Sequence, residues 1–142
     1  MARGLEEYIY EVSYRVRLFS EKRGPGELNE TERMIIEILG KRGEITISAL
    51  GRILPKKQST LSTLLTHLAV KKKLIKKRKS ETNKRMTLIS LSNQGKQTLE
   101  EIKTEQYAIF GFIKASLELT AEKEKLIKEI MDNSIRFFDA ML

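Results

Sequence analysis

The sequence predicts a mainly α-helical protein of 142 residues with one small β-hairpin near its middle. Along six segments, apolar residues recur at intervals of three and four, the period of a helix with one buried face. Between residues 74 and 91 the pattern changes to two short stretches joined by a polar turn, which is typical of paired strands. A chain of this length fits one domain, or one domain with an oligomerisation element.

The first two helices are separated by a break at Gly24-Pro25-Gly26. The first is expected over residues 5–19. The second follows Asn29, a helix-capping residue with Glu32 three positions later, and is expected to stop at Gly43. The apolar stripe of the first helix is expected to contain Leu5, Tyr8, Ile9, Val12, Val16 and Phe19, and the side chains expected to point inward from the second are Met34, Ile35, Ile38 and Leu39.

A short third helix is capped by Thr46 and closed by Pro55, with Ile47, Leu50, Ile53 and Leu54 on its apolar side. A fourth helix is expected from Lys57 to about Lys72. Its leucines recur at intervals of three and four, which predicts a narrow buried stripe. These leucines are Leu61, Leu64, Leu65 and Leu68.

Two strands, residues 74–80 and 86–91, are expected to form a hairpin around the polar tip 81–85. Ser92 can then cap a long helix to about Leu117, and Thr120 can cap a last helix that runs to the end of the sequence given. The apolar side of the first of these helices is expected to carry Leu99, Ile102, Ile109, Phe110 and Ile113, and the last helix contains Leu126, Ile127, Ile130 and Ile135.

Positive charge is concentrated in the middle of the chain. The formal net charge is +8, but between Glu44 and Glu100 thirteen lysines and arginines face a single acid, Glu81. The remainder of the chain is slightly acidic. This uneven distribution of charge favours a polyanionic partner over a general role in solubility. Solubility would not require acidic residues to be excluded from one region of the chain.

The fourth helix predicts a surface suited to the major groove of DNA. With its leucines buried, its other side carries short hydrogen-bonding side chains that can approach base edges closely. A helix that only faced water would more often carry Glu and Lys pairs. The residues of this helix predicted to contact DNA are Gln58, Ser59, Thr60, Ser62, Thr63, Thr66 and His67.

The hairpin predicts the electrostatic part of the same interface. A short helix, a tight turn, an amphipathic helix and a basic hairpin form the order of a winged helix-turn-helix. Cations on the hairpin and before the fourth helix can neutralise phosphates, and an arginine at the tip can enter the minor groove. The residues predicted for these roles are Lys56, Lys57, Lys76, Lys77, Arg78, Lys79, Lys84 and Arg85.

Other classes of function find little support. There are no cysteines, and the single histidine, His67, cannot form a metal site alone, so we expect it to be solvated or to face a phosphate. No catalytic triad, phosphate-binding glycine loop or close carboxylate pair is evident, so we expect neither an enzyme nor a cofactor. No apolar run is long enough for a membrane helix or a signal peptide, which favours the cytoplasm.

The sequence resembles the multiple-antibiotic-resistance regulator (MarR) family of winged-helix transcription factors over nearly its whole length. LNETERMIIEILGKRGEITISALGRIL resembles the family's second and third helices, QSTLSTLLTHL its recognition helix, and NKRMTLISLSNQG its wing strand and fifth helix. The family shows Asp-x-Arg at the wing tip and then Leu-Thr-x-x-Gly. Here these are Asn83-Lys84-Arg85 and Leu91-Ser92-Asn93-Gln94-Gly95. Lys71-Lys72-Lys73 replaces the glycine that usually ends the recognition helix, with one additional residue.

The resemblance implies a single MarR-like domain over residues 1–142, with a DNA-binding lobe at 28–92 and a helical dimerisation region at 1–23 and 93–142. It also implies a homodimer that regulates genes at pseudo-palindromic sites, typically as a repressor. Small aromatic or apolar ligands often release such a dimer from its DNA. Tyr14, Phe19 and Tyr107 are available to line a ligand site. The large apolar residues of the terminal helices independently favour a shared interface. These are Tyr8, Ile9, Val12, Phe110, Phe112, Ile113, Ile135, Phe137, Phe138, Met141 and Leu142.

Two readings of the basic surface stay open at the level of sequence. One is a dimeric, sequence-specific regulator that binds double-stranded DNA. The other is an architectural or RNA-associated winged-helix protein that uses charge alone and has no operator. Selection from random DNA separates them, because only the first returns a consensus sequence.

Overall fold

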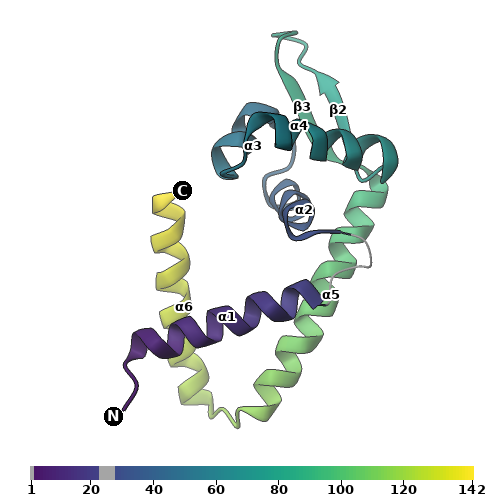
Figure 1. Ribbon diagram of the computed structural model, residues 1–142. Coiled ribbons are helices and arrows are strands. Elements are labelled where there is room, and N and C mark those ends of the chain that lie inside the picture. Colours follow the sequence, from purple (N-terminus) through teal and green to yellow (C-terminus); the bar gives the residue numbers. More distant parts are fainter. Residues whose placement is uncertain (1, 23–27) are drawn as a thin grey trace. The chain divides into compact units, whose positions relative to one another are not determined.

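The computed structural model describes residues 2–22 and 28–142, in two compact units, Met1–Ile102 and Lys103–Leu142 (Figure 1). The expected break at Gly24-Pro25-Gly26 lies outside the described residues. The fold is mostly helical with one small antiparallel sheet, as predicted. The elements are α1 (Leu5–Lys22), α2 (Glu30–Arg42), β1 (Ile45–Thr46), α3 (Ile47–Ile53), α4 (Gln58–Thr66), a π-helical turn η1 (His67–Lys71), β2 (Ile75–Lys79), β3 (Thr87–Leu91), α5 (Asn93–Ser116) and α6 (Ala121–Met141).

Short polar side chains begin four of the helices, as their positions in the sequence predict. The side-chain oxygens of Asn29 and Thr46 accept hydrogen bonds from the backbone N–H groups three residues later, at 2.8 and 3.0 Å. Those of Ser92 and Thr120 do the same at 3.0 and 3.2 Å. Each bond satisfies a donor that the first helical turn otherwise leaves without a partner.

The hydrophobic core lies among α2, α3, α4, the sheet and the first turns of α5. In α2 the inward stripe differs from the prediction. Met34 is 42% exposed, whereas Ile36 is fully buried. Residues 32, 35, 36 and 39 lie on the face of α2 that packs against the core. Position 34 points away from this face because successive helical residues are rotated by about 100°. The fully or nearly fully buried residues of the other elements include Leu50, Leu54, Leu61, Leu65, Leu68, Ile89 and Ile102.

The sheet contains the predicted hairpin and one strand that the sequence did not reveal. Its order is β1-β3-β2, with both neighbouring pairs antiparallel. The hairpin register places Ile75 opposite Leu91 and Lys79 opposite Thr87. The additional strand, β1, pairs Ile45 with Ile89. It is only two residues long, too short for an alternating pattern.

The junction between α4 and the hairpin is a π-helical turn. The Lys72 N–H donates to the His67 carbonyl at 3.1 Å, and the Leu74 N–H donates to the Leu68 carbonyl at 2.8 Å. The wider π turn accommodates one more residue than an α-helical turn, which fits the additional residue in this segment. Lys73 adopts a left-handed conformation, with φ of 56°, which glycine adopts more readily than other residues.

The first turn of α5 holds this junction in place. The Ser92 hydroxyl donates to the Lys73 carbonyl at 2.6 Å, and the Ser92 N–H donates to the Leu74 carbonyl at 3.0 Å. Gly95 packs against the same backbone, so closely that a Cβ there would lie 2.0 Å from the Leu74 oxygen. The first turn of α5 therefore supports the base of the hairpin.

We predict that Gly95→Ala destabilises the protein by about 2–3 kcal/mol, because the backbone of Leu74 must move to admit the methyl group. Gly51→Ala in α3 is the matched control. Its added Cβ would lie 3.8 Å from Leu61, an ordinary contact, and alanine is the better helix former. Urea unfolding should thus show Gly95→Ala well below the wild type and Gly51→Ala at or above it. Equal midpoints for the two variants would contradict this account of the junction.

Candidate nucleic-acid interface

The helix α4 presents its hydroxyl face to solvent, as the leucine spacing predicts. Leu61 and Leu65 are buried in the core, and this fixes the rotation of the helix about its axis. Directly opposite the leucines lie Ser59, Thr63 and Thr66. All six residues of α4 predicted to contact DNA are exposed, namely Gln58, Ser59, Thr60, Ser62, Thr63 and Thr66.

Two of the threonine hydroxyls already have partners. The Thr63 hydroxyl donates to the Ser59 carbonyl at 3.0 Å. Thr63 consequently offers a methyl group and oxygen lone pairs, but no free hydrogen. The Thr66 hydroxyl accepts from the Lys77 ammonium at 3.3 Å, which connects α4 to the hairpin.

The cations of β2 divide between the two faces of the hairpin. Because side chains alternate along a strand, Lys77 and Lys79 lie on one face and Lys76 and Arg78 on the other. The contact between Lys77 and Thr66 identifies the first face as the side next to α4. The Lys79 ammonium reaches across to the neighbouring strand β3, where it donates to the Thr87 hydroxyl at 2.9 Å.

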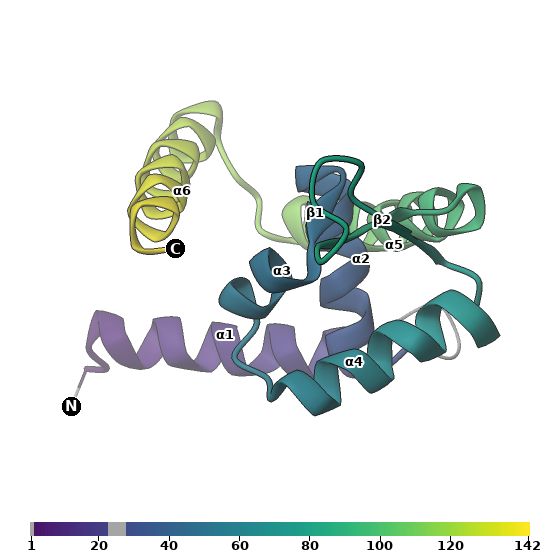
Figure 2. The same cartoon turned by 90° about the horizontal axis from the view of Figure 1, so that it is seen from above.

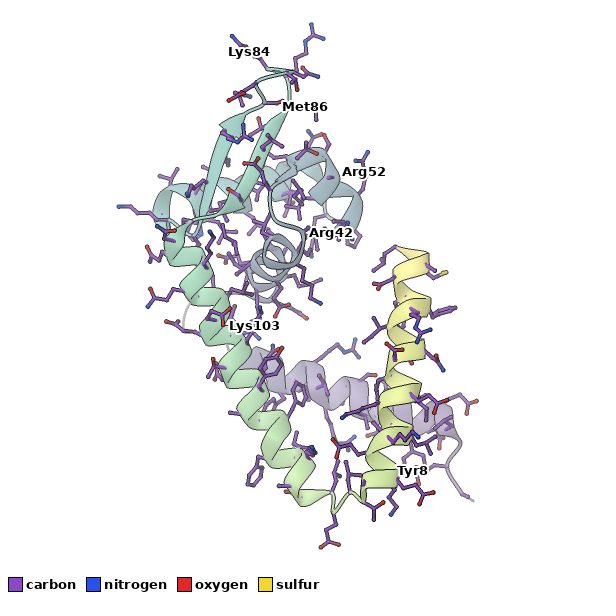
Figure 3. All side chains as sticks on the ribbon, turned by 180° about the vertical axis from the view of Figure 1, so that it is seen from behind. Tyr8, Arg42, Arg52, Lys84, Met86 and Lys103 are labelled. Carbon is purple, nitrogen blue, oxygen red and sulfur yellow. The ribbon has the colours of Figure 1, made fainter. Side chains whose placement is uncertain are left out.

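The hairpin extends beyond α4 in Figure 1, and Figure 3 shows Lys84 at its tip, close to Met86. In the tip, the Asn83 side-chain oxygen accepts from the Arg85 backbone N–H at 3.1 Å. The Asn83 N–H in turn donates to the hydroxyl of Ser80 at 3.3 Å, a largely buried residue. Asn83 therefore orders the backbone of the tip, and both Lys84 and Arg85 are exposed.

Arg78 forms a bidentate ion pair with Glu44, the residue before β1. Its Nε donates to one carboxylate oxygen at 2.8 Å, and its terminal nitrogen donates to the other. Hydrogen bonding to Arg78 and its positive charge lower the pKa of Glu44, and the same bond raises the pKa of Arg78. Arg78 was predicted to contact DNA, but in the free protein its charge is balanced by Glu44.

A second carboxylate, Glu32 of α2, lies beneath the π-helical turn. The Lys72 ammonium donates to it at 2.8 Å, and the His67 Nδ1 lies 3.9 Å from the same oxygen. The Glu32 side chain is only 5% exposed, whereas His67 is half-buried at the surface. Lys72 thus ties the end of the recognition helix to α2. The sequence predicts the helix cap that precedes Glu32 but gives no sign of this contact, because the contact joins residues 40 positions apart.

The other predicted cations stand at the edges of the exposed helix. Lys56 and Lys57 are exposed immediately before α4, and Lys57 occupies its N-cap position. Figure 2 shows α4 along the outside of this unit, with α2 and α3 behind it. Within residues 2–22 and 28–142, no cluster of three or more His, Cys, Asp or Glu residues could hold a metal ion. None of the helices in the same described residues is long and apolar enough to cross a membrane.

A short helix, a turn, an exposed second helix and a basic hairpin on one core define this part of the chain as a winged helix-turn-helix. The sequence model of the MarR family matches residues 28–87, which confirms the family resemblance for this segment. Solved structures with the same fold match nearly the entire chain. No curated protein sequence matches this chain.

Three solved structures illustrate the similarity in fold. FabT of Streptococcus pneumoniae, in complex with DNA, has a TM-score of 0.78 at 21% identity, covering 97% of each chain. A mutant of MarR from E. coli has a TM-score of 0.74 at 18% identity, covering 95% of this chain and 98% of that one. PcaV of Streptomyces coelicolor, in complex with its natural ligand, has a TM-score of 0.63 at 14% identity, covering 100% and 99%.

We predict that the ion pair between Glu44 and Arg78 makes stability depend on pH. Because the pKa of Glu44 is lowered in the folded state, its contribution is fully present above the ordinary value of 4.5 and is lost as the pH falls through the lowered pKa. The difference in denaturation midpoint between wild type and Glu44→Gln should therefore shrink below pH 4.5. Arg78→Met should give the same profile as Glu44→Gln, whereas Lys76→Met, on the same face of the strand, should not. A constant difference from pH 7 to pH 3 would contradict this interpretation.

Proposed function

We propose that this chain is a sequence-specific, double-stranded DNA-binding transcription regulator that acts as a homodimer on a pseudo-palindromic operator. The observation that carries the proposal is the exposed hydroxyl face of α4, flanked by exposed cations on the hairpin and before the helix. A major groove about 12 Å wide admits a helix whose outward side chains are this short. The two half-sites would lie one turn of DNA apart, about 34 Å.

The cations divide into contacts that position the protein and contacts that reach a groove. Lys56 and Lys57 lie at the start of α4, and Lys77 and Lys79 lie on the neighbouring face of β2, so they suit phosphates on either side of the major groove. Lys84 and Arg85 at the tip suit an adjacent minor groove, where the potential is more negative. FabT of S. pneumoniae, the similar structure described above, was solved with DNA.

A homodimer is supported by the apolar faces of the terminal helices. The helix α6 has no buried residue, although Ile135, Phe137, Phe138 and Met141 lie along it. Tyr8, Ile9 and Val12 of α1, Ile113 of α5 and the C-terminal Leu142 are also exposed. Monomeric soluble proteins rarely expose large apolar patches, and a second copy of the chain would cover the apolar faces of these helices symmetrically.

We further propose repression that a small aromatic or apolar ligand relieves. A dimer that covers an operator overlapping a promoter excludes other proteins from the same DNA, which is sufficient for repression. Exposed aromatic residues of the helices outside the winged lobe, Tyr14, Phe19 and Tyr107, offer apolar contacts for a ligand. PcaV of S. coelicolor, which shares the fold, was solved with its natural ligand.

The decisive experiment is a selection of bound duplexes from random DNA, followed by affinity measurements at several salt concentrations. We expect a pseudo-palindromic consensus. Arg85→Ala should weaken binding to every duplex and reduce the slope of log K against log salt by about 1. Thr63→Ala should instead change the preference among duplexes with little effect on that slope. A selection without a consensus would favour the architectural or RNA-associated alternative.

The dimer is tested by placing a charge on the apolar face of α6. Phe138→Lys should convert the dimer to a monomer, because an ammonium group cannot be buried in an apolar interface without a partner. Asp139→Lys adds the same side chain one residue further, on the polar side of the helix, and should remain dimeric. Sedimentation equilibrium measures both masses. A wild-type chain that sediments as a monomer at micromolar concentration would refute the proposed dimer.

A further inference from the structure

The exposed face of α4 carries no charged side chain. The helix consists of Gln58-Ser-Thr-Leu-Ser-Thr-Leu-Leu-Thr66 and contains no Lys, Arg, Asp or Glu. Guanine is most often read by a bidentate Arg or Lys, and cytosine can be read by a carboxylate that accepts from its amino group. Neither kind of contact is available from the central turns of this helix.

The cations nearest to α4 are placed at its ends. Lys57 precedes the first helical residue, and the Lys77 ammonium bonds Thr66, the last residue of α4. Arg78 lies on the other face of its strand and is paired with Glu44. The base pairs beneath the middle of the helix therefore meet only hydroxyl, methyl and amide groups.

The hydrogen bond of Thr63 further restricts which base atoms this residue can contact. Its hydroxyl hydrogen is donated to the Ser59 carbonyl at 3.0 Å, so Thr63 cannot easily donate to the O6 or N7 acceptors of guanine. Its methyl group remains available, at an exposed position directly opposite the buried Leu61 and Leu65. The base feature that complements a methyl group in the major groove is the C5-methyl of thymine.

Two other residues also favour A·T base pairs. Gln58, exposed at the first position of α4, carries the amide that can bond both N6 and N7 of adenine. Arg85, exposed at the hairpin tip, suits the narrow minor groove of A·T-rich DNA. These residues lie on different elements, so their shared preference does not come from one local feature.

We propose that each half-site of the operator carries A·T pairs beneath the centre of α4, and that Thr63 recognises a thymine there through methyl–methyl contact. The inference rests on the proposed function, because it specifies the DNA that this helix reads. Affinity at these positions comes from excluding water from two methyl groups rather than from charge. It should therefore be nearly independent of salt, unlike the contribution of the hairpin.

The test uses the full-length protein and the duplex returned by the selection. Each thymine beneath the helix is replaced in turn by deoxyuridine, which lacks only the 5-methyl group. For the wild type, one replacement should weaken binding by about fourfold per half-site, the effect of losing one buried methyl. Replacements outside the protected region serve as the DNA control.

Two variants assign the contact to Thr63. Thr63→Ser keeps the hydroxyl but loses the methyl group, so it should bind the thymine duplex about fourfold more weakly and lose its sensitivity to deoxyuridine. Thr63→Val keeps a methyl group and loses the hydroxyl, so it should retain both affinity and sensitivity. Both variants replace an exposed residue and should fold normally.

The outcomes separate this inference from the function on which it rests. A consensus with G·C pairs beneath the helix would overturn the inference and leave the proposed regulator intact. Thr63→Ser that remains sensitive to deoxyuridine would also overturn it, because another residue would then contact the methyl group. A selection that returns no consensus at all would overturn both proposals together.

Discussion

The burial of the α4 leucines is the constraint on which the orientation of the exposed hydroxyl face depends. Leu61, Leu65 and Leu68 lie in the core, and each contributes about 1.5–3 kcal/mol by leaving water. Any rotation of α4 about its axis would expose at least one of them. The hydroxyl face opposite the leucines is therefore held outward by hydrophobic packing, so its own residues can vary with the DNA to be read without loss of the fold.

Charge has a more selective role than the total of +8 indicates. Two carboxylates that lie close to the basic segment in space, Glu32 and Glu44, bind Lys72, which follows the π-helical turn, and Arg78 of β2. These ion pairs hold the recognition helix and the hairpin to the α2–β1 region. The cations that remain exposed are consequently presented from elements whose positions are fixed, which lowers the entropy lost when they meet phosphates.

Much of this fold could be predicted from the sequence because its determinants are local. Helix caps at Asn29, Thr46 and Thr120 act on backbone groups three residues away, and the leucine stripe of α4 is an expression of helical period. The prediction failed for Met34 and for β1. In both cases the answer depends on neighbours that are distant in sequence, namely the elements that cover α2 and the strand β3 that pairs with Ile45.

The sequence by itself therefore determined the order of elements, the apolar side of α4 and the concentration of cations along the hairpin. Only the tertiary structure decided which of those cations are balanced by carboxylates, how the additional residue enters a π-helical turn, and which face of the hairpin adjoins the recognition helix. The reason is physical. Periodicity and capping act over three or four residues, whereas the two ion pairs and the pairing of β1 with β3 join residues 34 to 44 positions apart, whose distances are set by the packed core.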